Sequence, residues 1–151
     1  MRYKRIQIFL PFLFIFLLSS SLHGQDVVRV KRVIDGDTIL LADGERVRLI
    51  GVDTPETKHP QKPVERFGKE AYLFTKRMVE GKEVHLEYDW QRRDKYNRLL
   101  AYVYLLDGTF LNAEIIKQGY GFAYTRFPFK YLEEFRKYER EARENKRGLW
   151  K

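Results

Sequence analysis

The chain has 151 residues, a length that favours one domain, and it contains no cysteine, which excludes disulfide bridges, cysteine-ligated zinc and thiol catalysis. Its formal charge is +8 at pH 7, and because Arg2, Lys4 and Arg5 supply three of these charges, the rest of the chain carries +5. Surface Lys and Arg side chains release counterions from phosphate backbones, so this charge favours a polyanionic partner such as nucleic acid; attraction to anionic lipid and a merely solvated basic surface are the alternatives.

The N-terminal residues have the order of a secretory signal peptide. A basic stretch, residues 1–5, precedes an almost unbroken apolar run at 6–18, and small and polar residues follow at 19–25. The apolar run is shorter than the roughly 20 residues of a membrane-spanning helix. We therefore expect residues 1–24 to be a cleaved signal peptide and 25–151 to be an exported domain, periplasmic or secreted. An uncleaved membrane anchor and a buried core helix are the alternatives.

Three strands are predicted at the start of the exported domain. Residues 28–34 and 38–41 are rich in aliphatic side chains and are separated by an Asp-Gly-Asp turn at 35–37. A second Asp-Gly turn at 43–44 precedes a partly alternating segment at 46–51. Short strands joined by tight turns of this kind predict a β-meander.

A helix is predicted between Pro63, which suits a first helical turn, and Gly81, which suits a C-terminal stop. Its apolar side chains recur at alternating steps of three and four residues, which places them on one stripe facing the core. These residues are Val64, Phe67, Ala71, Phe74 and Met78.

The C-terminal half predicts two further strands, at 83–88 and 99–105, and two further helices, at 111–118 and 131–145. Gly148 ends the last helix, and the apolar pair that follows it can pack back onto the domain. The inner side of that helix is expected to carry Leu132, Phe135, Tyr138 and Ala142.

Five strands with a helix between the third and the fourth is the order of an OB-fold, a barrel that commonly binds nucleic acids or sugars across one face. The predicted fold is therefore a five-stranded β-barrel with three helices, preceded by the signal peptide.

Acidic residues stand at two strand ends that a meander can bring to one rim. Asp37 begins a predicted strand, and Asp53 and Glu56 follow the end of another. With a carbonyl or hydroxyl of Thr54 they would make a hard oxygen site, which suits the irregular coordination of calcium better than the strict octahedron of magnesium. The alternatives are an ordinary Asp-Gly turn and an ordinary helix N-terminus.

Two arginines could complete a phosphodiesterase site. Arg48 lies among apolar residues of a predicted strand, and Arg98 closes a turn immediately before another. Two guanidinium groups can hold one phosphate and stabilise charge on its oxygens, while a metal and a carboxylate activate water. The alternative is a pair of exposed arginines in weak surface ion pairs.

Four other residues are candidate substrate contacts. Tyr96 and Tyr124 could offer a hydroxyl to phosphate or a flat face to a base, and core packing is the alternative for either. Lys62 and Lys95 are candidate contacts to backbone phosphate.

At these residues the chain resembles the staphylococcal (micrococcal) nuclease family, over residues 28–150. Four segments in the same order make the resemblance specific: 34–38 (IDGDT), 52–60 (VDTPETKHP), 74–80 (FTKRMVE) and 94–98 (DKYNR). It implies an OB-fold with three helices, calcium dependence, and cleavage of single-stranded DNA, duplex DNA and RNA that leaves 3′-phosphate ends.

The resemblance also implies roles for individual residues. The implied calcium ligands are Asp37, Asp53 and the backbone carbonyl of Thr54. The implied catalytic residues are Arg48, which holds the phosphate, Glu56, which orients or deprotonates the attacking water, and Arg98, which stabilises the transition state or leaving oxygen. Asp35 matches a family acid near the metal that is not a direct ligand, and Tyr96 and Tyr124 match residues that contact nucleotide.

Two positions depart from the family pattern. Asn97 stands where the family often has glycine, and because Asn tolerates a left-handed backbone, we expect this turn to survive. Pro63 stands where a more flexible residue is common, so the loop from Glu56 to Pro63 is expected to be stiffer. Neither change removes a catalytic group.

The main alternative to a nuclease is an OB-fold module that binds nucleic acid without cleaving it. Such a module could lose Arg48, Glu56 or Arg98 without penalty, yet all three are present. DNA and RNA are the expected partners of a monomer with no obligate protein partner, and a membrane would be involved only if the signal peptide were uncleaved.

Overall fold

The computed structural model describes residues 27–57 and 66–151. The predicted signal peptide, the helix start expected at Pro63 and Val64, and the candidate phosphate contact Lys62 lie outside these ranges. Within them, no helix is both long and apolar enough to cross a membrane.

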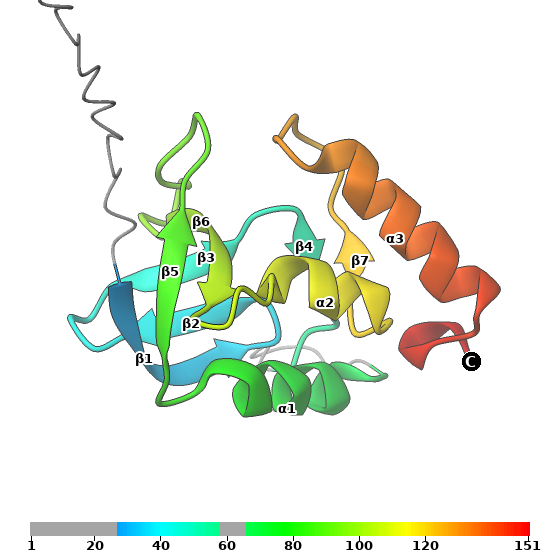
Figure 1. Cartoon of the computed structure of the whole chain (residues 1–151), viewed down its shortest axis with the longest axis horizontal. Coiled ribbons are helices and arrows are strands. Elements are labelled where there is room, and N and C mark those ends of the chain that lie inside the picture. Colours follow the sequence, from blue (N-terminus) through cyan, green and yellow to red (C-terminus); the bar gives the residue numbers. More distant parts are fainter. Residues whose placement is uncertain (1–26, 58–65) are drawn as a thin grey trace, which may run out of the picture.

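Five strands close a barrel in the spatial order β1-β2-β3-β6-β5 (Figure 1). Neighbouring strands are antiparallel except β3 and β6, which run parallel. The strands are β1 (Val27–Asp35), β2 (Thr38–Leu41), β3 (Arg46–Leu49), β5 (Glu83–Glu87) and β6 (Leu99–Leu105). With three helices around it, this barrel confirms the predicted architecture.

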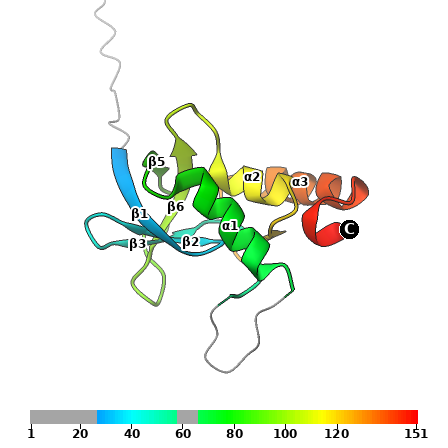
Figure 2. The ribbon, with the colours of Figure 1, turned by 90° about the horizontal axis from the view of Figure 1, so that it is seen from below.

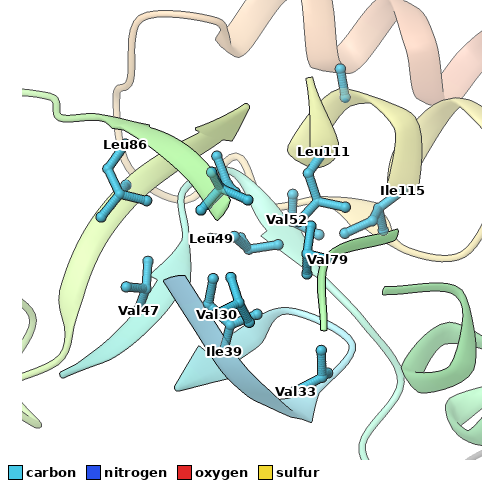
Figure 3. Packing of buried hydrophobic residues seen from close by; sticks show 14 of the residues in the cluster. Val30, Val33, Ile39, Val47, Leu49, Val52, Val79, Leu86, Leu111 and Ile115 are labelled. Atoms are coloured by element: carbon cyan, nitrogen blue, oxygen red, sulfur yellow. The ribbon is translucent and has the colours of Figure 1, made fainter. Parts of the chain in front are cut away.

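The barrel interior is filled by side chains that lie two residues apart on four of the five strands (Figure 3). Successive side chains of a strand point to opposite faces, so residues i and i+2 share the buried face. These pairs are Ile39 and Leu41, Val47 and Leu49, Val84 and Leu86, and Ala101 and Val103. On β1 the buried pair is Val30 and Val33, three residues apart, because the pairing register with β2 shifts between them.

Helix α1 (Gly68–Val79) lies beneath the barrel in the view of Figure 1 and crosses it in Figure 2. Its most buried side chains are Ala71, Thr75 and Val79, whereas Phe74 and Met78 are only half-buried at the margin. The predicted inner stripe is therefore turned by one position. Thr75 can face the core because its hydroxyl donates a 2.6 Å hydrogen bond to the carbonyl of Gly36, which no apolar pattern indicates.

Two strands of two residues each were not predicted. β4 (Val52–Asp53) and β7 (Phe122–Ala123) pair with each other in an antiparallel sheet. β3 ends at Leu49, earlier than expected, because Gly51 takes a left-handed φ of 72° and turns the chain toward β7. The turn sets Asp53 and the residue after it at the edge of the barrel.

The C-terminal helices pack together beside the barrel, with α2 (Leu111–Lys117) next to α3 (Leu132–Glu144). Phe135 and Ala142 are buried on α3 as predicted, while Leu132 and Tyr138 are half-buried. A short 3-10 turn, η1 (Gly148–Trp150), follows. Its Trp150 ring meets the ring of Phe122 edge-on at 5.4 Å, which confirms the expected packing after the glycine cap.

Candidate active site

Two carboxylates converge on one arginine at the edge of the barrel. Asp37 lies in the turn before β2, Arg48 lies in β3 opposite Thr38, and Asp53 lies in β4. Nη2 of Arg48 is 3.3 Å from Oδ2 of Asp37 and 3.3 Å from Oδ1 of Asp53. Residues from three elements thus place two negative charges around one point.

The Arg48 side chain is held in one orientation by the backbone. Its Nη1 donates to the carbonyl of Val52 at 2.5 Å and to that of Leu49 at 3.2 Å. Only 16% of the side chain is exposed. The alternative of a solvated surface arginine is therefore wrong for Arg48.

Asp37 links the β2 strand to the segment after β4. Its Oδ1 accepts a 2.9 Å hydrogen bond from the Thr38 hydroxyl. Its Oδ2 accepts from the backbone N–H of Thr54 at 3.0 Å and from the Thr54 hydroxyl at 3.2 Å. Because these contacts fix the backbone at Thr54, they also fix the position of its neighbour Asp53.

Asp35 and Glu56 form a second acidic pair on the same rim. Oδ1 of Asp35 accepts hydrogen bonds of 2.9 Å from the N–H of Gly36 and from the hydroxyl of Thr57. Burial, followed by a hydrogen bond to the Glu56 side chain, raises the pKa of Asp35 to about 6. The neutral form of the Asp35 carboxyl is therefore favoured, and its hydrogen bond to Glu56 places that side chain beside the turn that contains Asp37.

The oxygen donors at this rim suit a hard divalent cation. In residues 27–57 and 66–151, no three His, Cys, Asp or Glu side chains gather as a metal-binding group. Asp37 and Asp53 both lie 3.3 Å from Nη2 of Arg48, and Thr54, whose N–H donates to Asp37, follows Asp53 in the chain. Carboxylate and carbonyl oxygens are ligands that calcium accepts in irregular arrangements. The residues present fit such an ion.

Arg98 is positioned by a tight turn at the start of β6. The N–H of Asn97 donates to the carbonyl of Asp94 at 3.0 Å, and Asn97 has a left-handed φ of 60°, as expected for a residue that replaces glycine. Nε of Arg98 donates to Oδ2 of Asp94 at 2.7 Å. Because Asp94 takes the Nε side, the outer edge of the guanidinium is directed away from it.

The Asp94 carboxylate stays ionised beside Arg98. Burial alone would raise its pKa, but hydrogen bonds from the backbone and side chain of Arg98 outweigh this effect, so the pKa lies below its usual value. The anion therefore persists at neutral pH and holds Arg98 through a charge-assisted hydrogen bond.

Arg48 and Arg98 line one pocket of about 440 Å³ between the β5–β6 loop and the segment after β7. Three predicted substrate contacts, Lys95, Tyr96 and Tyr124, also line it. Tyr124 is half-buried and donates its N–H to the carbonyl of Gly51 at 2.9 Å. The two arginines are thus brought together as predicted, with Glu56 outside the pocket wall on the acidic rim.

Part of the pocket wall was missed by the sequence reasoning. It is apolar, mostly aromatic, and comes from two loops: Trp90 from one, and Phe127, Pro128 and Phe129 from the other. The available signal was a set of large aromatic residues in polar loop segments, which in a sequence with 15% aromatics is weak.

The family model described as "Staphylococcal nuclease homologue" matches residues 46–151. The thermonuclease of Staphylococcus hyicus is 44% identical over 131 residues, which cover 84% of this chain and 77% of the relative. The thermonuclease of Staphylococcus intermedius is 46% identical over 136 residues, 87% of this chain and 80% of the relative. The chain belongs to the staphylococcal nuclease family. Endonuclease YncB of Bacillus subtilis (strain 168) is 43% identical over 129 residues, 82% of this chain and 61% of the relative.

In this member of the staphylococcal nuclease family, the turn between β1 and β2 packs tightly against Thr54. A Cβ added at Gly36 would lie 2.7 Å from the Thr54 hydroxyl oxygen, closer than real Cβ contacts come. We expect Gly36→Ala to displace Thr54 from Asp37, to lower the free energy of unfolding by about 1–3 kcal/mol, and to weaken cation binding. Urea denaturation and calorimetric titration with calcium measure the two effects.

Gly44→Ala is the matched control for that substitution. A Cβ at Gly44 meets nothing within 4 Å, but the backbone φ of 92° is strained for alanine. This variant is expected to lose stability and keep its calcium affinity. Equal calcium affinities for Gly36→Ala and Gly44→Ala would contradict the assigned role of the turn.

Proposed function

We propose that this chain is a calcium-dependent nuclease that hydrolyses phosphodiester bonds in DNA and RNA and leaves 3′-phosphate ends. The observation that carries the proposal is the convergence of Asp37 and Asp53 on Arg48, since Arg48 also lines a pocket with Arg98. The names of the relatives support it, because two are called thermonucleases and one an endonuclease.

Asp37, Asp53 and the backbone carbonyl of Thr54 would hold the calcium ion. When bound, calcium supplies charge neutralisation and polarisation of the phosphodiester. The hydrogen bonds from Thr54 to Asp37 keep the carbonyl of Thr54 and the adjacent Asp53 in place before the cation arrives.

The two arginines both line the pocket and bind the phosphate there. Arg48, oriented by the carbonyls of Leu49 and Val52, donates to a non-bridging oxygen. Arg98, anchored through Nε by Asp94, presents its outer edge to the charge that develops on the phosphate and the leaving oxygen. Groups oriented in advance in this way stabilise the transition state without reorganising.

Glu56 acts on the attacking water. Its carboxylate accepts a proton as the water oxygen forms a bond to phosphorus, and the bond from phosphorus to the 5′ oxygen breaks. A proton then reaches that 5′ oxygen, so the products are a 3′-phosphate and a 5′-hydroxyl. The hydrogen bond between Glu56 and Asp35 keeps the base on the rim.

The activity is tested with a supercoiled plasmid and a structured RNA, each incubated with calcium, with magnesium, and with chelator. We expect nicking of the plasmid and degradation of the RNA with calcium, and loss of both with chelator. Binding of both substrates without cleavage in any condition would instead identify a non-catalytic OB-fold module.

The cation site is tested by Asp37→Ala and Asp53→Ala. Each removes one of the two carboxylates around Arg48, so we expect calcium affinity to fall by about tenfold or more. Calorimetric titration and the calcium-induced rise in Tm measure it without relying on activity. Asp43→Ala, in the exposed β2–β3 turn, is the matched control and is expected to bind calcium like the wild type. Unchanged affinity in both site variants would contradict the ligand assignment.

We also propose export of a monomeric domain after removal of residues 1–24. Mass spectrometry of the protein recovered outside the cytoplasm is expected to find an N-terminus near Gln25. An intact Met1 in the membrane fraction would indicate the anchored form.

A further inference from the structure

Three large aromatic side chains are exposed around the pocket. The exposed fractions are 69% for Trp90, 60% for Tyr96 and 63% for Phe127, and all three residues line the pocket that contains Arg48 and Arg98. A cluster of exposed apolar side chains beside a charged site indicates a ligand-binding or interaction surface.

The Trp90 side chain is fixed although it is exposed. Its indole Nε1 donates to the carbonyl of Pro128 at 3.2 Å, and its backbone N–H donates to Oδ1 of Asp89 at 2.8 Å. The other oxygen of Asp89 accepts from the N–H of Lys130 at 2.8 Å and from the Tyr102 hydroxyl at 2.6 Å.

These bonds tie two loops together. The β5–β6 loop and the loop between β7 and α3 lie at the same end of the molecule (Figure 1). Trp90 belongs to the first and Phe127 to the second, and Asp89 holds both loops. The wall that carries both aromatic faces is therefore organised before any ligand binds.

The positive charges beside this aromatic wall favour a ligand that carries phosphate. Arg48, Lys95 and Arg98 line the same pocket, so a phosphate held by the arginines brings its attached nucleoside to the aromatic wall. Cationic groups beside exposed aromatic faces are the combination by which proteins bind single-stranded nucleic acid, because each unpaired base offers a flat face for stacking. In a duplex those faces are covered by neighbouring bases.

We propose that Trp90 and Phe127 form a stacking surface for an unpaired base next to the scissile phosphate, and that this surface makes the chain favour single-stranded over duplex substrates. Neither residue is among those that the family resemblance implies. The inference rests on the proposed nuclease function and adds a specificity-determining pair to it.

The test compares kcat/KM on a single-stranded oligodeoxynucleotide with kcat/KM on the duplex of the same sequence. Trp90→Ala and Phe127→Ala are each expected to lower the ratio of the two values by about tenfold, mainly through KM for the single strand. Leu106→Ala removes a side chain that is 57% exposed and does not line the pocket, so it is expected to change neither value.

Trp90→Phe separates stacking from the bond to Pro128. Phenylalanine keeps an aromatic face and lacks the indole donor, so a stacking role predicts that most of the single-strand preference returns. A loss as large as that of Trp90→Ala would assign the effect to the loop contact and overturn the proposal. An unchanged ratio in both alanine variants would overturn it as well.

A binding measurement distinguishes failure of this inference from failure of the nuclease proposal. The sequence has two tryptophans, so Trp150→Phe leaves Trp90 as the only indole. In chelator, a single-stranded oligodeoxynucleotide is expected to quench its fluorescence, and an abasic strand of equal length is expected not to do so. Quenching without cleavage supports the surface and rejects the nuclease; cleavage by the wild type without quenching rejects the surface alone.

Discussion

Arg98→Ala is expected to lower kcat for DNA hydrolysis by about a hundredfold or more while calcium affinity stays unchanged. Arg98 is anchored by Asp94 at 2.7 Å and lines the pocket with Arg48, so its charge is held in advance at the place where the proposed function puts the phosphate. Loss of one preorganised stabiliser of transition-state charge typically costs this much. Single-turnover cleavage of an oligodeoxynucleotide at saturating calcium measures the step directly.

Two comparison variants make that result specific. Arg98→Lys keeps the charge but loses the planar fork, and it is expected to recover only part of the rate. Arg92→Ala removes an exposed arginine of the same loop, whose guanidinium lies 3.5 Å from the centre of the Tyr88 ring and which does not line the pocket. It is expected to cleave at the wild-type rate. Wild-type turnover by Arg98→Ala would remove Arg98 from the mechanism.

The barrel could be predicted because its determinants are local. Alternation places Ile39 and Leu41, and likewise Val47 and Leu49, on one face of their strands, and Asp-Gly turns join these strands. Each of these sequence patterns spans only a few residues and can be recognised without knowing which strand pairs with which. The elements that depend on such patterns are therefore the ones found at the expected positions.

The elements that were missed depend on contacts between distant residues. β4 and β7 are too short to have a period, and they exist because Val52 pairs with Ala123. The buried face of α1 includes Thr75 because the carbonyl of Gly36, 39 residues away, accepts its hydroxyl proton. A prediction from hydrophobicity treats Thr75 as an exposed polar residue, so the predicted buried face of the helix is shifted by one position.

The candidate site, like the fold, has a part that sequence motifs predict and a part that depends on contacts between distant residues. Motifs identified Asp37, Arg48 and Arg98, and only the fold reveals that Nη2 of Arg48 meets two carboxylates from different elements. The contact from Trp90 to Pro128 joins residues 38 positions apart, so no motif contains it. Residue type and spacing indicated which side chains are candidates for catalysis and cation binding, whereas the aromatic wall could be recognised only from the three-dimensional arrangement.

Glu56→Gln is expected to lower kcat by roughly a hundredfold or more, with KM and stability close to those of the wild type. Glutamine has the size of glutamate and its side-chain amide can hydrogen-bond with Asp35 in place of the carboxylate, so the rim is kept. It cannot accept a proton, however, and the attacking water loses its base. Single-turnover cleavage gives the rate, and thermal unfolding with and without calcium checks the fold and the cation site.

The substitution separates a chemical role of Glu56 from a purely structural one. If Glu56 only braced the turn through Asp35, glutamine would brace it as well, and Glu56→Gln would cleave at the wild-type rate while Glu56→Ala would not. If Glu56 is the base, both variants lose turnover, and both still bind calcium through Asp37 and Asp53. Glu45→Gln changes a carboxylate that only pairs with Arg93 at the surface, so it should leave turnover intact. The pattern across the three variants therefore assigns the role of Glu56 without depending on the size of any single effect.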